Sequence, residues 1–147
     1  MINDLDIILS EGESYTVEFK ETPDKELPEE VCAFANASGG KIYIGIHDEG
    51  YVVGTDISNA ARSRIQDTIN KVEPRINVSM DVIDNIIMLT VPAGTHKPYS
   101  CPAGFYLRSG PNSQKLKRDN IIEFFQSEDR VLASGEINHS ETGEKSQ

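Results

Sequence analysis

Two pairs of β-rich runs, each joined by a short polar turn, constrain most strongly what this chain can fold into. The runs are residues 41–47 and 51–53, and residues 76–83 and 86–91. Their connections, Asp48-Glu49-Gly50 and Asp84-Asn85, are typical of β-hairpins. Helical periodicity predicts helices over 4–9, 28–37, 59–72 and 118–126. Hairpins with helices between them favour an α+β fold, so we expect a mixed, mainly antiparallel sheet flanked by helices.

The length of 147 residues fits one domain with a tail. We expect the domain to cover residues 1–127 and residues 128–147 to form an acidic, disordered tail or linker, because that stretch is polar and lacks aromatic residues. No run of 18 apolar residues predicts a membrane span. The acidic N-terminus is unlike a signal peptide. Together with the absence of a CxxC pair, these features predict a cytoplasmic protein with no membrane partner.

Charge is distributed unevenly along the chain. The net charge of −10 argues against a protein whose whole surface wraps duplex DNA. Residues 104–118, however, contain four cations and no acid. We expect nucleic acid to be contacted by Arg108, Lys115, Lys117 and Arg118, together with Lys20. The alternative interpretation is an ordinary solvated surface, and further cations at helical spacing, Arg64, Lys71 and Arg75, allow the same two interpretations.

Three acids are candidates for metal binding. Glu18 lies on the polar face of the strand predicted over 15–20, and a turn at Gly12 and Ser14 would bring Glu13 back toward it. Asp48 follows the strand 41–47. Three carboxylates that converge in this way can hold Mg²⁺ or Mn²⁺, which activates water for phosphodiester cleavage. Each acid also has an ordinary structural interpretation, as a turn cap, an ion-pair partner or a turn residue.

Several common motifs are missing from the chain. It contains no GxxxxGK[ST], GxGxxG or GxSxG sequence, and its three histidines lack the spacing of zinc ligands. Gly39-Gly40 is followed by a strand, so we interpret it as the cap of the preceding helix rather than as a phosphate-binding loop.

Four blocks, in order, resemble the Schlafen AlbA-type domain. They are residues 13–21 (ESYTVEFKE), 33–40 (AFANASGG), 42–50 (IYIGIHDEG, followed by Val53-Gly54) and 105–110 (FYLRSG). The resemblance extends over about residues 10 to 126 and implies a Schlafen AlbA-like fold. One departure is His47, which precedes Asp48 at a position that is often acidic in relatives.

The resemblance implies a nucleic-acid-binding function. In the vertebrate Schlafen nucleases two copies of the domain form a basic horseshoe that cuts transfer and ribosomal RNA. Their three catalytic carboxylates correspond to Glu13, Glu18 and Asp48, which implies an endoribonuclease that uses Mg²⁺ or Mn²⁺ held by these residues. Because this chain has one copy of the domain, a homodimer could supply the second lobe.

Other members of the family support different expectations. Bacterial and archaeal relatives carry labels such as DNA-binding transcriptional regulator, RecG-related helicase or divergent ATP-binding protein. The alternatives are therefore a non-catalytic DNA-binding module of a transcriptional regulator, a nucleotide (ATP)-binding module, and a protein-interaction module. The absence of a nucleotide phosphate loop argues against ATP hydrolysis by this chain.

Overall fold

The computed structural model describes residues 4–139, which form four helices and six strands. In chain order these are α1 (Asp4–Glu11), β1 (Val17–Lys20), α2 (Leu27–Asn36), β2 (Gly40–Ile44), α3 (Asn59–Ile69), β3 (Ser79–Ile83), β4 (Ile86–Val91), β5 (Tyr106–Ser109), β6 (Asn112–Lys115) and α4 (Arg118–His139). The fold is therefore α+β, as expected.

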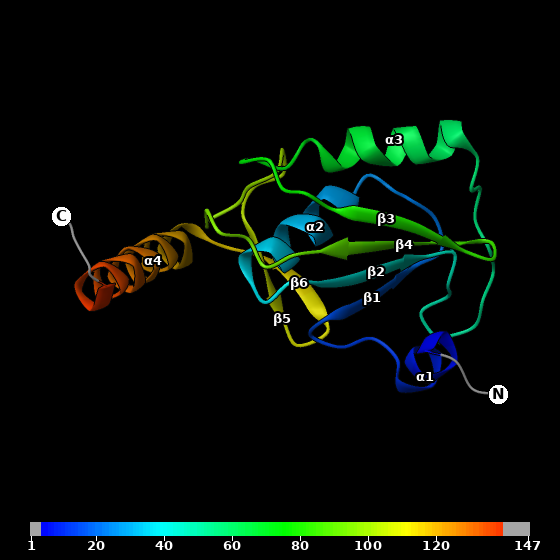
Figure 1. Ribbon diagram of the computed structural model, residues 1–147, viewed down its shortest axis with the longest axis horizontal. Helices are drawn as coiled ribbons and strands as arrows, with labels where there is room; N and C mark the ends of the chain where they lie inside the picture. The colour runs from blue at the N-terminus through cyan, green and yellow to red at the C-terminus, as the bar shows by residue number, and fades with distance from the viewer. Residues whose placement is uncertain (1–3, 140–147) are drawn as a thin grey trace. The chain divides into compact units, whose positions relative to one another are not determined.

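The main sheet has four strands in the order β1-β2-β4-β3 (Figure 1). β1 and β2 are parallel and are connected through α2, whereas β2–β4 and β4–β3 are antiparallel. The prediction of a mixed, mainly antiparallel sheet is thus confirmed. The hairpin predicted from residues 41–53 is reduced to one bridge between Ile46 and Val52, because both edges of β2 are already paired with β1 and β4.

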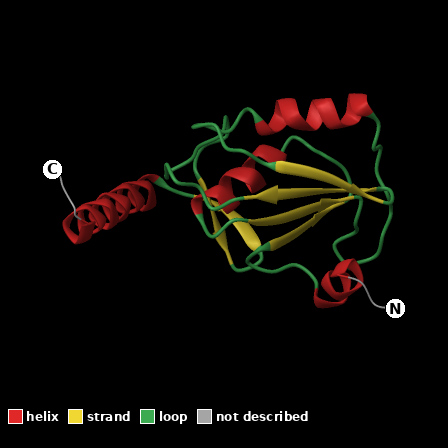
Figure 2. Cartoon of the chain, viewed as in Figure 1, coloured by secondary structure: helices red, strands yellow, loops and turns green. Residues whose placement is uncertain are grey.

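The two faces of this sheet, whose strands are yellow in Figure 2, carry different hydrophobic clusters. On one face the side chains of Ile42, Ile44, Ile87 and Leu89 pack in one cluster with buried residues of α2 and α3. On the other face Phe19, Tyr43 and Ile86 pack with Leu5, Ile8 and Leu9 of the short helix α1. Alternation of side chains along each strand produces this division.

The helix boundaries follow local sequence signals. Ser58 caps α3, and its hydroxyl accepts a hydrogen bond of 3.1 Å from the backbone N–H of Ala61. Gly39 ends α2 with a φ of +77°, and its N–H donates to the carbonyl of Phe34. The interpretation of Gly39-Gly40 as a helix cap is therefore confirmed.

A second, two-stranded sheet consists of the antiparallel hairpin β5–β6. The sequence indicates a short strand over 104–108 followed by a turn over 109–113, and it carries no strand signal for β6, whose composition is polar. Three of its four residues are exposed. A strand of this kind lacks the hydrophobic alternation that identifies strands from sequence.

The chain divides into two compact units, Met1–Lys115 and Leu116–Gln147. In the second unit, the helix expected to end at residue 126 continues to His139, where we had expected a disordered tail. Between these positions the sequence has no proline and contains helix formers such as Leu132 and Ala133. The remainder of the expected tail, residues 140–147, lies outside the described residues. No helix among the described residues is long and apolar enough to cross a membrane.

Candidate functional site

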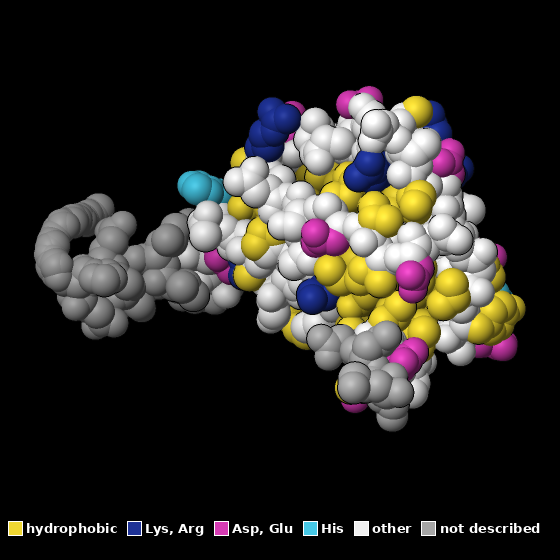
Figure 3. All heavy atoms as spheres, turned by 45° about the vertical axis from the view of Figure 1, so that its right-hand side comes forward, with side chains coloured by type: hydrophobic (Ala, Val, Ile, Leu, Met, Phe, Trp, Pro, Cys, Tyr) yellow, Lys and Arg dark blue, Asp and Glu magenta, His cyan; other side chains and the backbone are white. Residues whose placement is uncertain are grey.

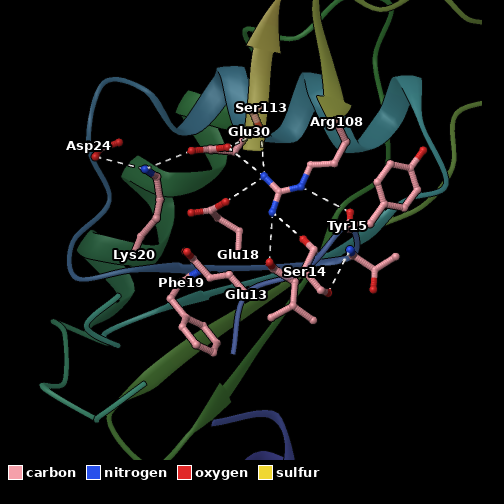
Figure 4. A network of polar contacts seen from close by, with 12 residues as sticks. Glu13, Ser14, Tyr15, Glu18, Phe19, Lys20, Asp24, Glu30, Arg108 and Ser113 are labelled. Carbon is pink, nitrogen blue, oxygen red and sulfur yellow. Dashed lines mark hydrogen bonds and ion pairs between the residues drawn. The ribbon is translucent and has the colours of Figure 1, made fainter. Parts of the chain in front are cut away.

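The most extensive polar network among the described residues surrounds Arg108 of β5 (Figure 4). Its side chain is fully buried, and each of the five guanidinium N–H groups has an acceptor. Nη1 donates to Glu18 at 2.8 Å and to Ser113 at 2.9 Å. The other donors reach three backbone carbonyls of the turn before β1 and of β1 itself, those of Ser14 (2.8 Å), Val17 (3.0 Å) and Tyr15 (3.3 Å).

The backbone and an aromatic ring fix the position of this guanidinium. On β5, Tyr106 and Arg108 alternate with Leu107 and Ser109, and both Tyr106 and Arg108 are buried. The Cζ atom of Arg108 lies over the ring of Phe34 of α2, 4.4 Å from its centroid. A cation in contact with an aromatic face is stabilised further when water is excluded. Arg108 therefore ties the β5–β6 hairpin to β1, to its preceding turn and to α2.

Two carboxyl groups contact this arginine, and a third is hydrogen-bonded to one of them. Glu18 of β1 pairs with it directly, and Glu30 of α2 lies 3.6 Å away while also accepting a short hydrogen bond from Ser113. The carboxylate of Glu13 accepts the backbone N–H of Phe19 at 3.0 Å and is hydrogen-bonded to the Glu18 side chain. The turn before β1 thus brings Glu13 back to Glu18, as its sequence had indicated.

The protonation of Glu18 is strongly perturbed. Burial and a hydrogen bond with Glu13, together with the negative charge of Glu30, raise the pKa of Glu18 from 4.5 to about 8, although Arg108 opposes this shift. Two carboxyl groups that share a hydrogen bond retain a proton between them. At neutral pH the Glu18 carboxyl group therefore holds a proton inside the network.

Lys20 belongs to the same network. Its side chain is 9% exposed, and its Nζ lies 3.2 Å from Asp24 and 3.5 Å from Glu30. Burial lowers the pKa of Lys20, but the charges of Glu30 and Asp24 outweigh that effect and raise it above its ordinary value. Lys20 remains charged and serves as the second cation of the network.

The raised pKa of Glu18 predicts a specific dependence of stability on pH. The folded state retains a proton that the unfolded chain releases above pH 4.5, so this stabilisation is complete below that value and disappears as the pH rises toward 8. We expect the free energy of unfolding to fall by about 2 kcal/mol over this range, a figure reduced for the residual solvent access of the side chain. The measurement is urea unfolding at a series of pH values.

The matched variants for this measurement are Glu18→Gln and Glu123→Gln. Glutamine mimics the protonated carboxyl group, so the first variant should be nearly insensitive to this pH change, whereas the second changes an exposed glutamate of α4 and should retain the wild-type slope. Equal slopes of the unfolding free energy against pH in the wild type and both variants would contradict the assignment of this pH dependence to Glu18.

The third predicted metal ligand does not join this group. Asp48 is exposed in the turn after β2, where its neighbour His47 stacks on Tyr51 and lies 3.6 Å from Glu21. Within residues 4–139, no three His, Cys, Asp or Glu side chains lie close enough together to hold a metal ion. The guanidinium 2.8 Å from Glu18 also places a positive charge where a cation would bind. The donor set therefore does not fit Mg²⁺ or Mn²⁺ in this arrangement.

The predicted nucleic-acid contacts fall into two groups. The side chains of Arg108 and Lys20 are largely buried and paired with acids, which leaves little of either cation accessible to a phosphate. Lys115 at the end of β6 is exposed, and so are Lys117 and Arg118 in the second unit. Arg118 also forms an exposed ion pair with Asp119. The exposed cations are those that remain available to a polyanion.

Sequence reasoning missed Glu30 and Asn36, which have structural roles around this site. Asn36, the last residue of α2, is buried and donates its side-chain amide to the carbonyls of Tyr99 (2.9 Å) and Tyr106 (2.8 Å). Its Oδ1 accepts the N–H of Tyr99 at 2.6 Å. An asparagine within the apolar run 31–37 was the available signal, because a buried amide requires partners from elsewhere in the fold.

A solved structure with a TM-score above 0.5 supports the fold. The crystal structure of the DIP2311 protein from Corynebacterium diphtheriae has 18% sequence identity and a TM-score of 0.56 over 77% of this chain, which spans only 24% of that structure. The solution structure of the N-terminal domain of a RecG-related protein from Nitrosomonas europaea, named for an ATP-dependent DNA helicase, has 25% identity and a TM-score of 0.48. The match covers 79% of this chain and 95% of that one. No curated protein sequence matches the chain.

The family comparison matches residues 13–117 to the family described as Schlafen, AlbA_2. The matched range contains β1 through β6 and the whole Arg108 network, and it agrees with the four blocks in the sequence. This chain belongs to the Schlafen AlbA_2 family.

Proposed function

We propose that this domain binds nucleic acid through the exposed cations Lys115, Lys117 and Arg118, and that it does so without metal-dependent cleavage. The carrying observation is the division of the acid-free stretch 104–118, in which Arg108 is buried while the three later cations are exposed. Membership of the Schlafen AlbA_2 family supports the same function, because the resemblance to this family implies nucleic-acid binding.

The acidic charge of the chain makes the exposed cations Lys115, Lys117 and Arg118 a candidate binding segment. With a net charge of −10, most of the surface repels a polyanion, so binding depends on places where accessible cations outnumber acids. Three phosphate contacts would make the affinity fall with salt at a logarithmic slope of about −2 to −3. Contacts to phosphates of this kind fix the position of nucleic acid but do not read its sequence.

The carboxylates support binding without cleavage. Glu18 is engaged by Arg108, Glu13 is engaged by the N–H of Phe19 and by Glu18, and Asp48 does not reach either within the described residues. These acids therefore stabilise the fold beside the binding segment. The non-catalytic alternative for this family is the one that the geometry favours.

The test measures binding of fluorescein-labelled single-stranded RNA and duplex DNA by fluorescence anisotropy across a salt titration. The variant Lys115→Gln/Lys117→Gln/Arg118→Gln should lose at least about tenfold in affinity at low salt and flatten the salt slope by about two to three. The matched control, Arg64→Gln/Lys71→Gln/Arg75→Gln, removes three exposed charges on and after α3 and should retain most of the affinity.

Two outcomes would contradict the proposal. Equal losses in the two triple variants would show that binding responds to total charge rather than to this segment, and no binding by the wild-type protein at low salt would remove the function altogether. The same RNA is incubated with Mg²⁺, Mn²⁺ or EDTA and resolved on a denaturing gel. We expect intact RNA in each case, and cleavage that depends on the metal would overturn the non-catalytic part.

A further inference from the structure

Within the first unit, the described residues cover only part of the face of the main sheet that carries α1. Cross-strand register places Lys41, Thr90 and Ser79 in one row, and Tyr43, Met88 and Asp81 in the next. α1 has only eight residues and packs through Leu5, Ile8 and Leu9, leaving Ile7 44% exposed. Lys41, Ser79 and Asp81 are exposed, while Met88 and Thr90 are half-buried. This surface is called the open face below.

The open face is largely apolar and is slightly hollowed. A groove of about 350 Å³ lies between α1 and the strands, and its apolar lining comes from Leu5, Ile7, Ile8, Tyr43, Ile83 and Met88. Figure 3 shows hydrophobic side chains grouped over one side of the molecule, with single acidic and basic side chains among them. Apolar surface bordered by polar residues is typical of an interaction site.

The two charges of the open face have opposite signs and are diagonal to each other. Lys41 lies on β2 and Asp81 on β3, with β4 between them and a shift of one row. Their strands are therefore about 10 Å apart, too far for a direct contact across β4. Among the side chains described, those of residues 5–128, no ion pair joins Lys41 or Asp81 to another residue.

We propose that the open face is the contact surface for a second copy of this chain. A two-fold axis in the plane of the interface, crossing β4 midway between Lys41 and Asp81, brings Lys41 to the partner's Asp81. The same axis brings Asp81 to the partner's Lys41. Such self-complementarity is what a two-fold interface requires, since each contact must occur twice.

The charge pattern favours a second copy over an unrelated partner. A strongly acidic protein approaching its own copy is repelled except where cations lie in the contact, and Lys41 supplies one on each side. Because Lys41 and Asp81 cancel, these two strand residues add no net charge to the face, and pairing leaves neither charge without a partner beside the apolar groove.

Charge reversal provides a test that does not depend on one variant. Lys41→Asp places two acids on the face, and Asp81→Lys places two cations on it, so each variant alone should repel its own copy. An equimolar mixture of the two restores both attractive pairs. By size-exclusion chromatography with light scattering, we expect the wild type at twice the chain mass of 16.3 kDa, each variant at the chain mass, and the mixture at the dimer mass.

The control is Lys71→Asp, which reverses an exposed charge after α3 and should leave the dimer intact. Circular dichroism checks that each variant is folded before it is mixed. A monomeric wild type at high protein concentration, a dimer that persists in both single variants, or a mixture that fails to recombine would each overturn the proposal. The assay uses no nucleic acid, so its result is independent of the proposed function.

Discussion

Replacement of Arg108 by methionine is expected to lower the free energy of unfolding by about 3 to 5 kcal/mol, the usual cost of breaking a buried ion pair from one side. The methionine would fill much of the volume but would remove one of the two cations beside Glu30, and would leave Glu18 and the carbonyl of Tyr15 without their donor. The carbonyls of Ser14 and Val17 would keep only the backbone hydrogen bonds between these two residues. A buried acceptor that loses its donor keeps its full desolvation cost. Urea unfolding monitored by circular dichroism measures the change.

The matched control for Arg108 is Arg118→Gln. Arg118 has a side chain that is 83% exposed, and its ion pair with Asp119 should contribute less than about 1 kcal/mol. A variant of Arg108 that is as stable as the wild type would show that the buried network does not hold β5–β6 in place. The prediction requires that substitution of two arginines only ten positions apart in the sequence have very different effects on the free energy of unfolding.

Asn36→Ala should produce the next largest loss, about 2 to 4 kcal/mol, because it deletes three buried hydrogen bonds at once. The amide connects the end of α2 to the segment at Tyr99 and to β5 at Tyr106, which are remote in sequence. Alanine would leave the N–H of Tyr99 without its acceptor, and the carbonyls of Tyr99 and Tyr106 with only the weak thiol donor of Cys32. The change is measured by the same urea unfolding experiment.

The control for this variant is Asn70→Ala, at the exposed C-cap of α3, where the side chain accepts one hydrogen bond from Gln66. We expect a change of less than about 0.5 kcal/mol there. Equal effects at Asn36 and Asn70 would mean that the three buried hydrogen bonds contribute little to the fold.

Much of the main sheet could be predicted from the sequence because its signals are local. Ser58 and Gly39 mark the start of one helix and the end of another, and the alternation around Val17 and Phe19 identifies β1. The turn at Asp84-Asn85 likewise predicts the β3–β4 hairpin. Each of these features depends on neighbours within a few residues.

The burial and the ion-pair partners of the site residues could not be predicted from the sequence. Glu18 and Lys20 were expected on a solvated face of β1, but α2 and the β5–β6 hairpin cover that face. The covering cation, Arg108, lies 90 positions later than Glu18, and no local pattern connects the two residues. A buried arginine and an exposed arginine look the same in a sequence. Arg108 is buried whereas Lys115 is exposed. Glu18 and Lys20 are likewise drawn into the buried network, where they stabilise the fold.

The central claim is that buried cations hold this fold together while exposed ones bind nucleic acid. The most direct test measures, on the same preparations, the urea midpoint and the RNA affinity of the wild type, Arg108→Met and Lys115→Gln/Lys117→Gln/Arg118→Gln, with affinities corrected for the folded fraction. We predict that Arg108→Met lowers the urea midpoint but changes the RNA affinity by less than about twofold. The triple variant should lower the RNA affinity and leave the urea midpoint nearly unchanged. An Arg108→Met protein that unfolds like the wild type but no longer binds RNA would contradict the account.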